Sequence, residues 1–231
     1  MNDAISDAAL EAAKRMENCH RLMNAGVTII DPAATYIDAD VTVGAGTVIH
    51  PGSHLKGRTI VGGGCEIGPN SILTDAQVGE GSRILCSVVT GAVLEDRVEV
   101  GPFCHLRPGT YLETEVRVGT CGEVKNSRLG RRTQMHHFSY IGDAQIGENV
   151  NIGAGTITCN FDGHRKNETI VESGAFIGSD TMLVAPVRLG KGSSTGAGAV
   201  VIRDVPEGKL AVGVPARVRD GPRDAGQETG R

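Results

Sequence analysis

The chain has 231 residues, a formal net charge of −4, and a composition of 33 Gly, 3 Tyr, 4 Phe and no Trp. With so few aromatic side chains, the core must consist mainly of small aliphatic residues, and the acidic balance argues against a nucleic-acid partner. The chain has no run of about eighteen apolar residues, so we expect no membrane span.

Residues 4–24 are predicted to form an amphipathic helix that ends at the C-cap signal Asn24-Ala25-Gly26. Its apolar stripe is Ala8, Ala9, Ala12, Ala13, Met16 and Leu22. Such a helix is marginal by itself, so we expect it to pack against another surface. We assign residues 1–25 to this element, which lacks the cationic start and apolar core of a secretion signal.

From Ile37 the sequence repeats every six residues, as in VGAGTV, IGPNSI, VGPFCH and IGAGTI. The first position is aliphatic, the second is often Gly, and the fifth is small. Three such hexads close a triangular coil of about eighteen residues, with Gly at corners that need positive φ. The pattern predicts an all-β solenoid, a parallel β-helix, over residues 26–214.

Six cysteines occur without a C-x-x-C pair: Cys19, Cys65, Cys86, Cys104, Cys121 and Cys159. Cys65 and Cys104 occupy positions where the repeat calls for a small inward residue. We therefore expect buried free thiols rather than disulfides or metal ligands, and a reducing, cytoplasmic location.

Two segments break the repeat and one follows it. Residues 125–144 shift the register, and residues 158–169 leave the coil as a loop before the repeat resumes at Ile170. Insertions in a solenoid project from its surface and often carry function. Residues 215–231 are charged and rich in Gly, which predicts a flexible tail.

The chemistry-bearing residues concentrate at these breaks. Arg107 and Lys125 are eighteen residues apart, which predicts that they stack one coil apart and form a local site for an anion such as phosphate. The alternative is a solvated pair of surface cations. The adjacent histidines of 136-HHFSY-140 suggest a general base, against the alternative of solvent-facing side chains.

Seven motifs in series carry a resemblance to a known family: GVTIIDP, GPFCHLRPGT, EVKNS, SYIGDA, NVNIGAGTITCNFDG, FIGSDTMLVAPV and AGAVVIRDV. From Gly26 to about Ala211 the chain closely resembles the acetyltransferase domain of the bifunctional glucosamine-1-phosphate acetyltransferases/N-acetylglucosamine-1-phosphate uridyltransferases. The resemblance implies a left-handed β-helix and a homotrimer. It also implies metal-free transfer of acetyl from acetyl-CoA to glucosamine 1-phosphate, on the route to UDP-N-acetylglucosamine for the cell envelope.

The resemblance also implies roles for single residues. His137 matches the family's general base, and Asn160 matches the amide where sugar and acetyl group meet. The residues that match contacts to the sugar or its phosphate are Arg107, Lys125, Tyr140, Asn151 and Lys166. The residues that match contacts to coenzyme A are Ala154, Ser179 and Ala197.

The chain departs from the family pattern at three points. Phe161 stands where the family usually has Tyr, and Val214 lies where some members have an arginine that contacts coenzyme A, for which Arg217 is a candidate substitute. We find no counterpart of the uridyltransferase half in the sequence, so the chain is either a fragment of a longer protein or a natural single-function enzyme. We therefore expect no uridyl transfer from this chain, and a separate uridyltransferase is a candidate partner.

Other functions remain open at this level. A zinc-dependent carbonic anhydrase also uses a trimeric left-handed β-helix, with three histidines converging on the metal. The histidines available are His50, His54, His105, His136 and His137. A non-catalytic trimeric scaffold is a further alternative. Within the enzymes, galactosamine 1-phosphate is an alternative acceptor, because it differs from glucosamine 1-phosphate in the stereochemistry at one hydroxyl.

Overall fold

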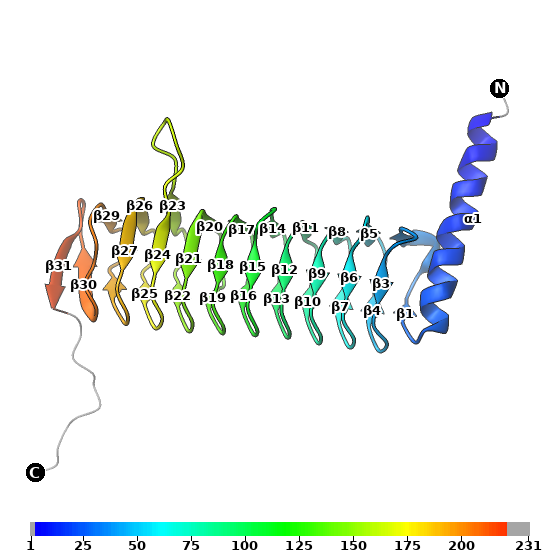
Figure 1. The fold of residues 1–231 in the computed structure, drawn as a ribbon, viewed down its shortest axis with the longest axis horizontal. Coiled ribbons are helices and arrows are strands. Elements are labelled where there is room, and N and C mark those ends of the chain that lie inside the picture. Colours follow the sequence, from blue (N-terminus) through cyan, green and yellow to red (C-terminus); the bar gives the residue numbers. More distant parts are fainter. Residues whose placement is uncertain (1–2, 221–231) are drawn as a thin grey trace, which may run out of the picture.

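The computed structural model describes residues 3–220, which form an elongated left-handed β-solenoid with the helix α1 (Asp3–Asn24) at its N-terminal end (Figure 1). A short 3₁₀ turn, η1 (Pro32–Ala34), lies in the first coil. The coils wind through three sheets of 12, 10 and 9 strands, in which every pairing but the last is parallel. The predicted fold class is confirmed.

The strands of the first sheet are β1 (Thr28–Ile29), β4 (Val48–Ile49), β7 (Glu66–Ile67), β10 (Arg83–Ile84), β13 (Glu99–Val100), β16 (Arg117–Val118), β19 (Gln134–Met135), β22 (Asn151–Ile152), β25 (Phe176–Ile177), β28 (Ser194–Thr195), β30 (Lys209–Val212) and β31 (Arg217–Asp220). Those of the second sheet are β2 (Tyr36–Ile37), β5 (His54–Lys56), β8 (Ile72–Thr74), β11 (Val88–Thr90), β14 (His105–Leu106), β17 (Gly122–Lys125), β20 (Ser139–Gly142), β23 (Ile157–Cys159), β26 (Met182–Val184) and β29 (Val200–Val201). Those of the third sheet are β3 (Thr42–Val43), β6 (Ile60–Val61), β9 (Gln77–Val78), β12 (Val93–Leu94), β15 (Tyr111–Leu112), β18 (Arg128–Leu129), β21 (Ala144–Ile146), β24 (Thr169–Val171) and β27 (Val187–Leu189).

The core is a set of stacked columns of inward side chains. In the first sheet one column runs through Ile49, Ile67, Ile84, Val100, Val118, Met135 and Ile152, all at most 3% exposed. Burying each of these large side chains is worth roughly 1.5–3 kcal/mol. The small fifth position of the hexad satisfies the corner backbone: the Thr47 hydroxyl donates to the Gly62 carbonyl at 2.8 Å and accepts from the Cys65 amide at 3.1 Å.

The hexad period is looser than the sequence pattern predicts. In the third sheet Ile60 pairs with Gln77, and Gln77 pairs with Val93, so these coils contain 17 and 16 residues. The corners of these coils are shorter than in an eighteen-residue coil, because tight turns with positive φ replace longer turns. The inward columns therefore stay in register even where a hexad has only five residues.

Cysteines follow the predicted pattern at two positions. Cys65 and Cys104 are each 2% exposed, and all six cysteines are free. The Cys104 thiol donates to the Gly119 carbonyl at 2.8 Å, and its burial raises the pKa of that thiol. Cys121 differs, since it lies exposed at a corner rather than in the core.

The helix α1 covers the open end of the first coil with its C-terminal part only. Cys19 and Leu22 are buried there, and the Arg21 guanidinium donates to the Val41 carbonyl at 3.0 Å. Contrary to the predicted stripe, the alanines from Ala8 to Ala13 are exposed, and Figure 1 shows this part of α1 extending beyond the coils. No helix within residues 3–220 has the length and apolarity needed to cross a membrane.

An additional strand pairs with the last strand at the C-terminal end of the solenoid. Residues 217–220, which we assigned to the flexible tail, form β31, antiparallel to β30. This strand pairs with β30 of the first sheet, so regular structure continues beyond the coils to Asp220. The remainder of the predicted tail, residues 221–231, lies outside the described residues.

Most glycines at the second hexad position serve close packing rather than positive φ. A Cβ added at Gly62 would lie 2.8 Å from the Glu80 amide nitrogen in the next coil, whereas Gly62 itself has an ordinary φ. Positive φ occurs at fourth-position glycines such as Gly46 and Gly64, and at the second-position glycines Gly68 and Gly101, each of which precedes a proline. Our expectation that corner glycines supply positive φ is therefore correct for these residues and wrong for second-position glycines such as Gly62.

This distinction predicts different effects at adjacent glycines. Gly62→Ala should lower the free energy of unfolding by about 1–3 kcal/mol, because the new methyl group would press on the backbone of the next coil. Gly63→Ala is the matched control, since its Cβ would approach only the Ala45 carbonyl oxygen, at 3.1 Å. Urea-unfolding midpoints compare the two variants. Equal losses would contradict the assignment of Gly62 to close packing.

Candidate functional site

One corner of the solenoid carries a column of equivalent positions in successive coils. They are the third residues of the hexads MHHFSY, IGAGTI, IGSDTM and TGAGAV, namely His137, Ala154, Ser179 and Ala197. The Asp180 amide donates to the Ala154 carbonyl at 2.6 Å, and the Gly198 amide donates to the Ser179 carbonyl at 2.8 Å, so the column continues along the stack. Neighbouring coils of such a stack are about 4.8 Å apart.

This column lines an open groove of about 600 Å³ that also contains Asn151 and Phe176. Glycines at the second hexad position form its floor: Gly153, Gly178 and Gly196. A side chain at Gly153 would meet the Ser179 amide nitrogen at 2.6 Å. The groove is therefore shallow and elongated, with imidazole rings at one end, a shape that suits a long, thin ligand.

Two histidines lie at one end of this groove, and their surroundings differ. The His136 ring nitrogen Nε2 lies 2.8 Å from Gln134 Oε1, and the two histidine rings meet edge to face with centroids 6.5 Å apart. His137 is exposed and has no hydrogen-bond partner within residues 3–220. Its ring nitrogens are therefore available to a ligand in the groove.

A second group of site residues lies at the far end of strand β20. The register places Arg107 and Lys125 one coil apart, as their spacing predicts, since Leu106 pairs with Val124. Lys166 reaches the same place from the loop that follows β23, and its ammonium group lowers the pKa of Lys125 below the usual value. Three cations thus converge, and this arrangement favours an anionic ligand.

The cationic group is partly compensated by acidic residues that the sequence patterns did not reveal. Arg107 Nη1 lies 2.9 Å from Glu123 Oε1, and both side chains are more than a third exposed. Asp143 accepts hydrogen bonds from the side-chain amides of Asn126, at 2.6 Å, and Asn160, at 2.5 Å. The sequence signal was present: the hexads that hold Asn126 and Asp143 have only five residues.

We had expected the shifts of register to position the histidines, and this expectation is wrong. Met135 and Ile141 are both buried and six residues apart, so the hexad with His136 and His137 is of normal length. The shortened hexads lie at the opposite corner, where Asn126 and Asp143 have φ of 43° and 50°. Their physical effect is to bring polar side chains together beside the cations.

Lys166 is carried by a hairpin that projects from the solenoid between β23 and β24 (Figure 1). Phe161 and Lys166 form an isolated antiparallel bridge, and the Asn167 amide donates to the Asn160 carbonyl at 2.7 Å. At the tip, Asp162 accepts from the His164 and Arg165 amides, both at 2.8 Å. The hydrogen bonds from the Arg165 amide, the Asn167 side chain and the His164 amide lower the pKa of the Asp162 carboxyl to about 2.

The depressed pKa predicts how the hairpin depends on pH. A carboxyl whose folded pKa is lowered stabilises the folded form above its unfolded pKa of about 3.9, and this contribution disappears as the pH falls through about 2. The amide resonances of the hairpin should therefore hold their positions down to about pH 4 and shift below it. Shifts that begin above about pH 5 would contradict this account.

The same contacts can be tested at neutral pH. Asp162→Ala removes the two amide contacts and the acceptor for the Asn167 side chain, 2.9 Å away. Trypsin should then cut after Arg165 or Lys166 several times faster than in the unaltered chain, because the hairpin tip opens more often. Glu168→Ala, at the other side of the hairpin, is the matched control, and it should leave the rate unchanged.

The two groups of site residues lie at opposite ends of β20. His137 precedes the strand and Asp143 follows it, whereas Tyr140 lies on the strand with its hydroxyl 3.4 Å from the Asn160 amide nitrogen. Four residues of strand span roughly 13 Å. Within residues 3–220 no hydrogen bond joins His137 to the cationic group, so a ligand that contacts both must bridge this strand.

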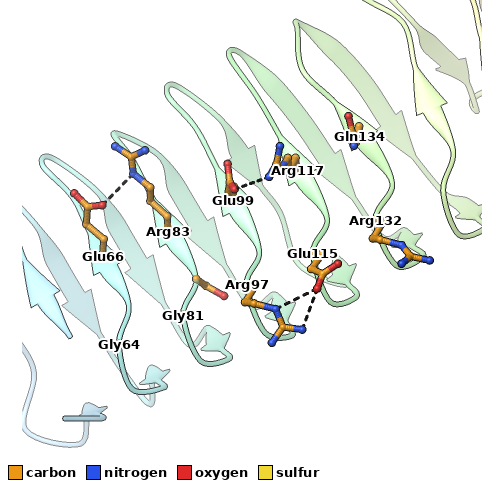
Figure 2. Close-up of a pocket in the computed structure, with 11 residues that line it drawn as sticks. Gly64, Glu66, Gly81, Arg83, Arg97, Glu99, Glu115, Arg117, Arg132 and Gln134 are labelled. Carbon is orange, nitrogen blue, oxygen red and sulfur yellow. Dashed lines mark hydrogen bonds and ion pairs between the residues drawn. The ribbon is translucent and has the colours of Figure 1, made fainter. Parts of the chain in front are cut away.

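A larger hollow, of about 680 Å³, lies on the first sheet and carries a different chemistry (Figure 2). Figure 2 shows three of its arginines, Arg83, Arg97 and Arg117, pointing toward glutamates on neighbouring coils, with Arg83 Nε 3.1 Å from Glu66 Oε2. Arg117 is paired in the same way with Glu99, at 3.2 Å. Because these charges neutralise one another, the hollow is a weaker candidate for an anion site than the cations at β20.

Two of the histidines outside the groove are engaged elsewhere. His50 lies 3.1 Å from a Glu66 carboxylate oxygen, and the His54 ring stacks on Tyr36 with centroids 4.3 Å apart. Among residues 3–220 there is no group of three or more His, Cys, Asp or Glu side chains placed to hold a metal ion.

The sequence matches known proteins over most of its length, although no family model matches it. It is 48% identical over 212 residues to the bifunctional protein GlmU of Carboxydothermus hydrogenoformans, covering 92% of this chain and 48% of that protein. It is 51% identical over 204 residues to GlmU of Thermotoga petrophila, covering 88% and 46%. The chain thus spans about half the length of these curated relatives.

Solved structures support the fold independently. LpxA, a UDP-N-acetylglucosamine acyltransferase from Bacteroides fragilis, superimposes with a TM-score of 0.56 at 17% identity, covering 82% of this chain and 73% of that one. These likenesses define the class as the hexapeptide-repeat proteins with a left-handed β-helix. Within this class, the chain belongs to the GlmU-like proteins, and it corresponds to about half of one.

Proposed function

We propose that this chain transfers the acetyl group of acetyl-CoA to the amino group of glucosamine 1-phosphate, as the acetyltransferase part of a GlmU-like protein. The observation that carries the proposal is the convergence of Arg107, Lys125 and Lys166 across one short strand from the groove that holds His137. An acetyltransferase of this kind needs an anion site, a base and a channel for a long thioester, in this order.

The groove suits the pantetheine arm of coenzyme A. Ala154, Ser179 and Ala197 repeat at the same corner of successive coils, and the glycine floor gives an extended chain close access to the backbone. The thioester would lie at the histidine end of the groove, beside His137. In this arrangement the phosphate of the sugar lies on the three cations, and its amine, on the adjacent carbon, lies near Tyr140 and Asn160. The His137 that meets this amine comes from a facing chain of the homotrimer proposed below.

In the proposed reaction, His137 accepts a proton from the ammonium group at C2, and the free amine attacks the thioester carbonyl carbon. The C–N bond forms, the C–S bond breaks, and the coenzyme A thiolate takes up a proton. A backbone N–H or the Ser179 hydroxyl at the same corner would stabilise the oxyanion, which is worth about 3–4 kcal/mol when the donor is well aimed. The step needs no covalent enzyme intermediate and no metal.

We further propose a homotrimer that completes the groove between subunits. The groove is open to solvent along its length, and the large apolar side chains of Phe103 and Phe138 are 67% and 59% exposed at the same corner. A partner chain lying along this corner would cover these rings and enclose the ligand. Light scattering of the purified protein should give a mass of three chains.

The experiment that tests the function is a thiol-release assay with acetyl-CoA and a set of acceptors. Glucosamine 1-phosphate should be acetylated at least tenfold more efficiently than galactosamine 1-phosphate or glucosamine without a phosphate. Thermal stabilisation by acetyl-CoA should accompany the activity, as linkage requires of a ligand that binds the folded state. No thiol release with any amino sugar, and no stabilisation, would favour a non-catalytic scaffold.

A further inference from the structure

Asp143 lies at the centre of a small polar network that the proposed mechanism does not yet use. Asp143 follows β20 directly, in the hexad that has only five residues. Its backbone holds it in place, since its N–H donates to the Lys125 carbonyl at 3.1 Å and its carbonyl accepts from the Thr169 amide at 3.1 Å. Its carboxylate is half-buried and accepts from both Asn126 and Asn160. The position of this carboxylate is thus fixed from several sides.

The identity of these partners determines how Asn160 is oriented. An ionised carboxylate can only accept hydrogen bonds, so the group that Asn160 turns toward Asp143 must be its NH₂ and not its carbonyl. Asn160 is 7% exposed. With the nitrogen committed to Asp143, the side-chain oxygen Oδ1 of Asn160 is left as the acceptor for other groups.

Tyr140 is the next member of this series of hydrogen bonds. The Asn160 nitrogen lies 3.4 Å from the Tyr140 hydroxyl oxygen, which therefore accepts from Asn160 and keeps its own proton for a further acceptor. Gly142 makes the arrangement possible, because a Cβ there would lie 2.3 Å from the Tyr140 hydroxyl oxygen and 2.8 Å from the Asn160 nitrogen. The Asp143 carboxylate thus determines the hydrogen-bonding direction of both side chains: Asn160 offers an acceptor and Tyr140 offers a donor.

We propose that Asp143 is a positioning residue that makes the acceptor site selective for an amine, by fixing Asn160 with its oxygen toward the group at C2 of the sugar. This inference rests on the proposed function and deepens it. An amine or ammonium group donates N–H bonds to that oxygen. A free Asn160 amide could instead rotate by half a turn and present NH₂, which repels an ammonium group and suits a hydroxyl acceptor.

The test uses Asp143→Asn, which keeps size and shape but removes the charge and the fixed direction. Asparagine tolerates the positive φ of 50° at this position, so folding should be preserved. The assay measures KM and kcat for glucosamine 1-phosphate, and Ki for glucose 1-phosphate, whose C2 hydroxyl can accept as well as donate. We expect kcat/KM to fall about 10–100-fold, while Ki for glucose 1-phosphate stays within about threefold.

Two further variants separate positioning from general structural support. Asn126→Ala removes the other partner of the same carboxylate and should change kcat/KM less than about threefold. The double variant Asp143→Asn/Asn160→Asp restores an amide–carboxylate pair with the carboxylate now beside the sugar. Its kcat/KM should be at least tenfold higher than that of Asp143→Asn, because an acceptor again faces the amine.

The outcomes distinguish the inference from the proposed function. If the unaltered chain transfers no acetyl group, both are overturned. If it is active but Asp143→Asn keeps the original ratio of Ki for glucose 1-phosphate to KM for glucosamine 1-phosphate, the inference alone is wrong. A double variant no better than Asp143→Asn would also overturn it, since a purely steric or stabilising role predicts no recovery.

Discussion

Replacing His137 by alanine is expected to lower the rate of acetyl transfer by about 10²–10⁴-fold, the usual contribution of a general base. The imidazole lies at one end of the groove, and its nitrogens have no partner among residues 3–220. Without it, the ammonium group of the acceptor has no base to remove its proton. The loss should appear in kcat rather than in KM for acetyl-CoA, because the groove itself is unchanged.

The adjacent histidine provides the matched control. His136 lines the same groove but is engaged with Gln134 through Nε2. His136→Ala should therefore reduce the rate less than about tenfold. Both variants should melt within a few degrees of the unaltered chain, because both side chains are exposed. Equal losses of activity in the two variants would falsify the assignment of the base to His137.

The architecture could be predicted from the sequence because it depends on a short repeat. An aliphatic residue every six positions predicts the inward columns, and small residues at the fifth position predict where Cys65 and Cys104 pack. Arg107 and Lys125 stack as predicted for the same reason, since the number of residues per coil sets which side chains are neighbours. Local periodicity thus determines most of this fold.

Features that depend on one corner or one contact could not be predicted in this way. The pairing of Asp143 with Asn160 depends on a five-residue hexad and a positive φ, which the aliphatic pattern does not report. The exposed part of α1 was also mispredicted. Its alanine stripe is a helical pattern, but the first coil is only large enough to cover the turn that holds Cys19 and Leu22. Strand β31 was missed because its exposed residues show no hydrophobic alternation.

Lys125→Met is expected to raise KM for glucosamine 1-phosphate by about 10–100-fold, the equivalent of one lost charge-assisted hydrogen bond of about 1.5–3 kcal/mol. Lys125 is placed beside Lys166, which lowers its pKa, so the two ammonium groups repel one another until an anion binds. A phosphate between them relieves that repulsion and forms the new bonds. Both effects are lost when methionine replaces the lysine, although the aliphatic stem is retained.

The repeat supplies a control at an equivalent position. Lys56 follows the buried Leu55 as Lys125 follows the buried Val124, on β5 of the same sheet, and it is exposed. Lys56→Met removes the same charge from the same corner, several coils from the proposed site, and should leave KM unchanged. For glucosamine without a phosphate, both variants should match the unaltered chain. A rise in KM for that substrate in Lys125→Met would mean that Lys125 contacts the sugar rather than the phosphate.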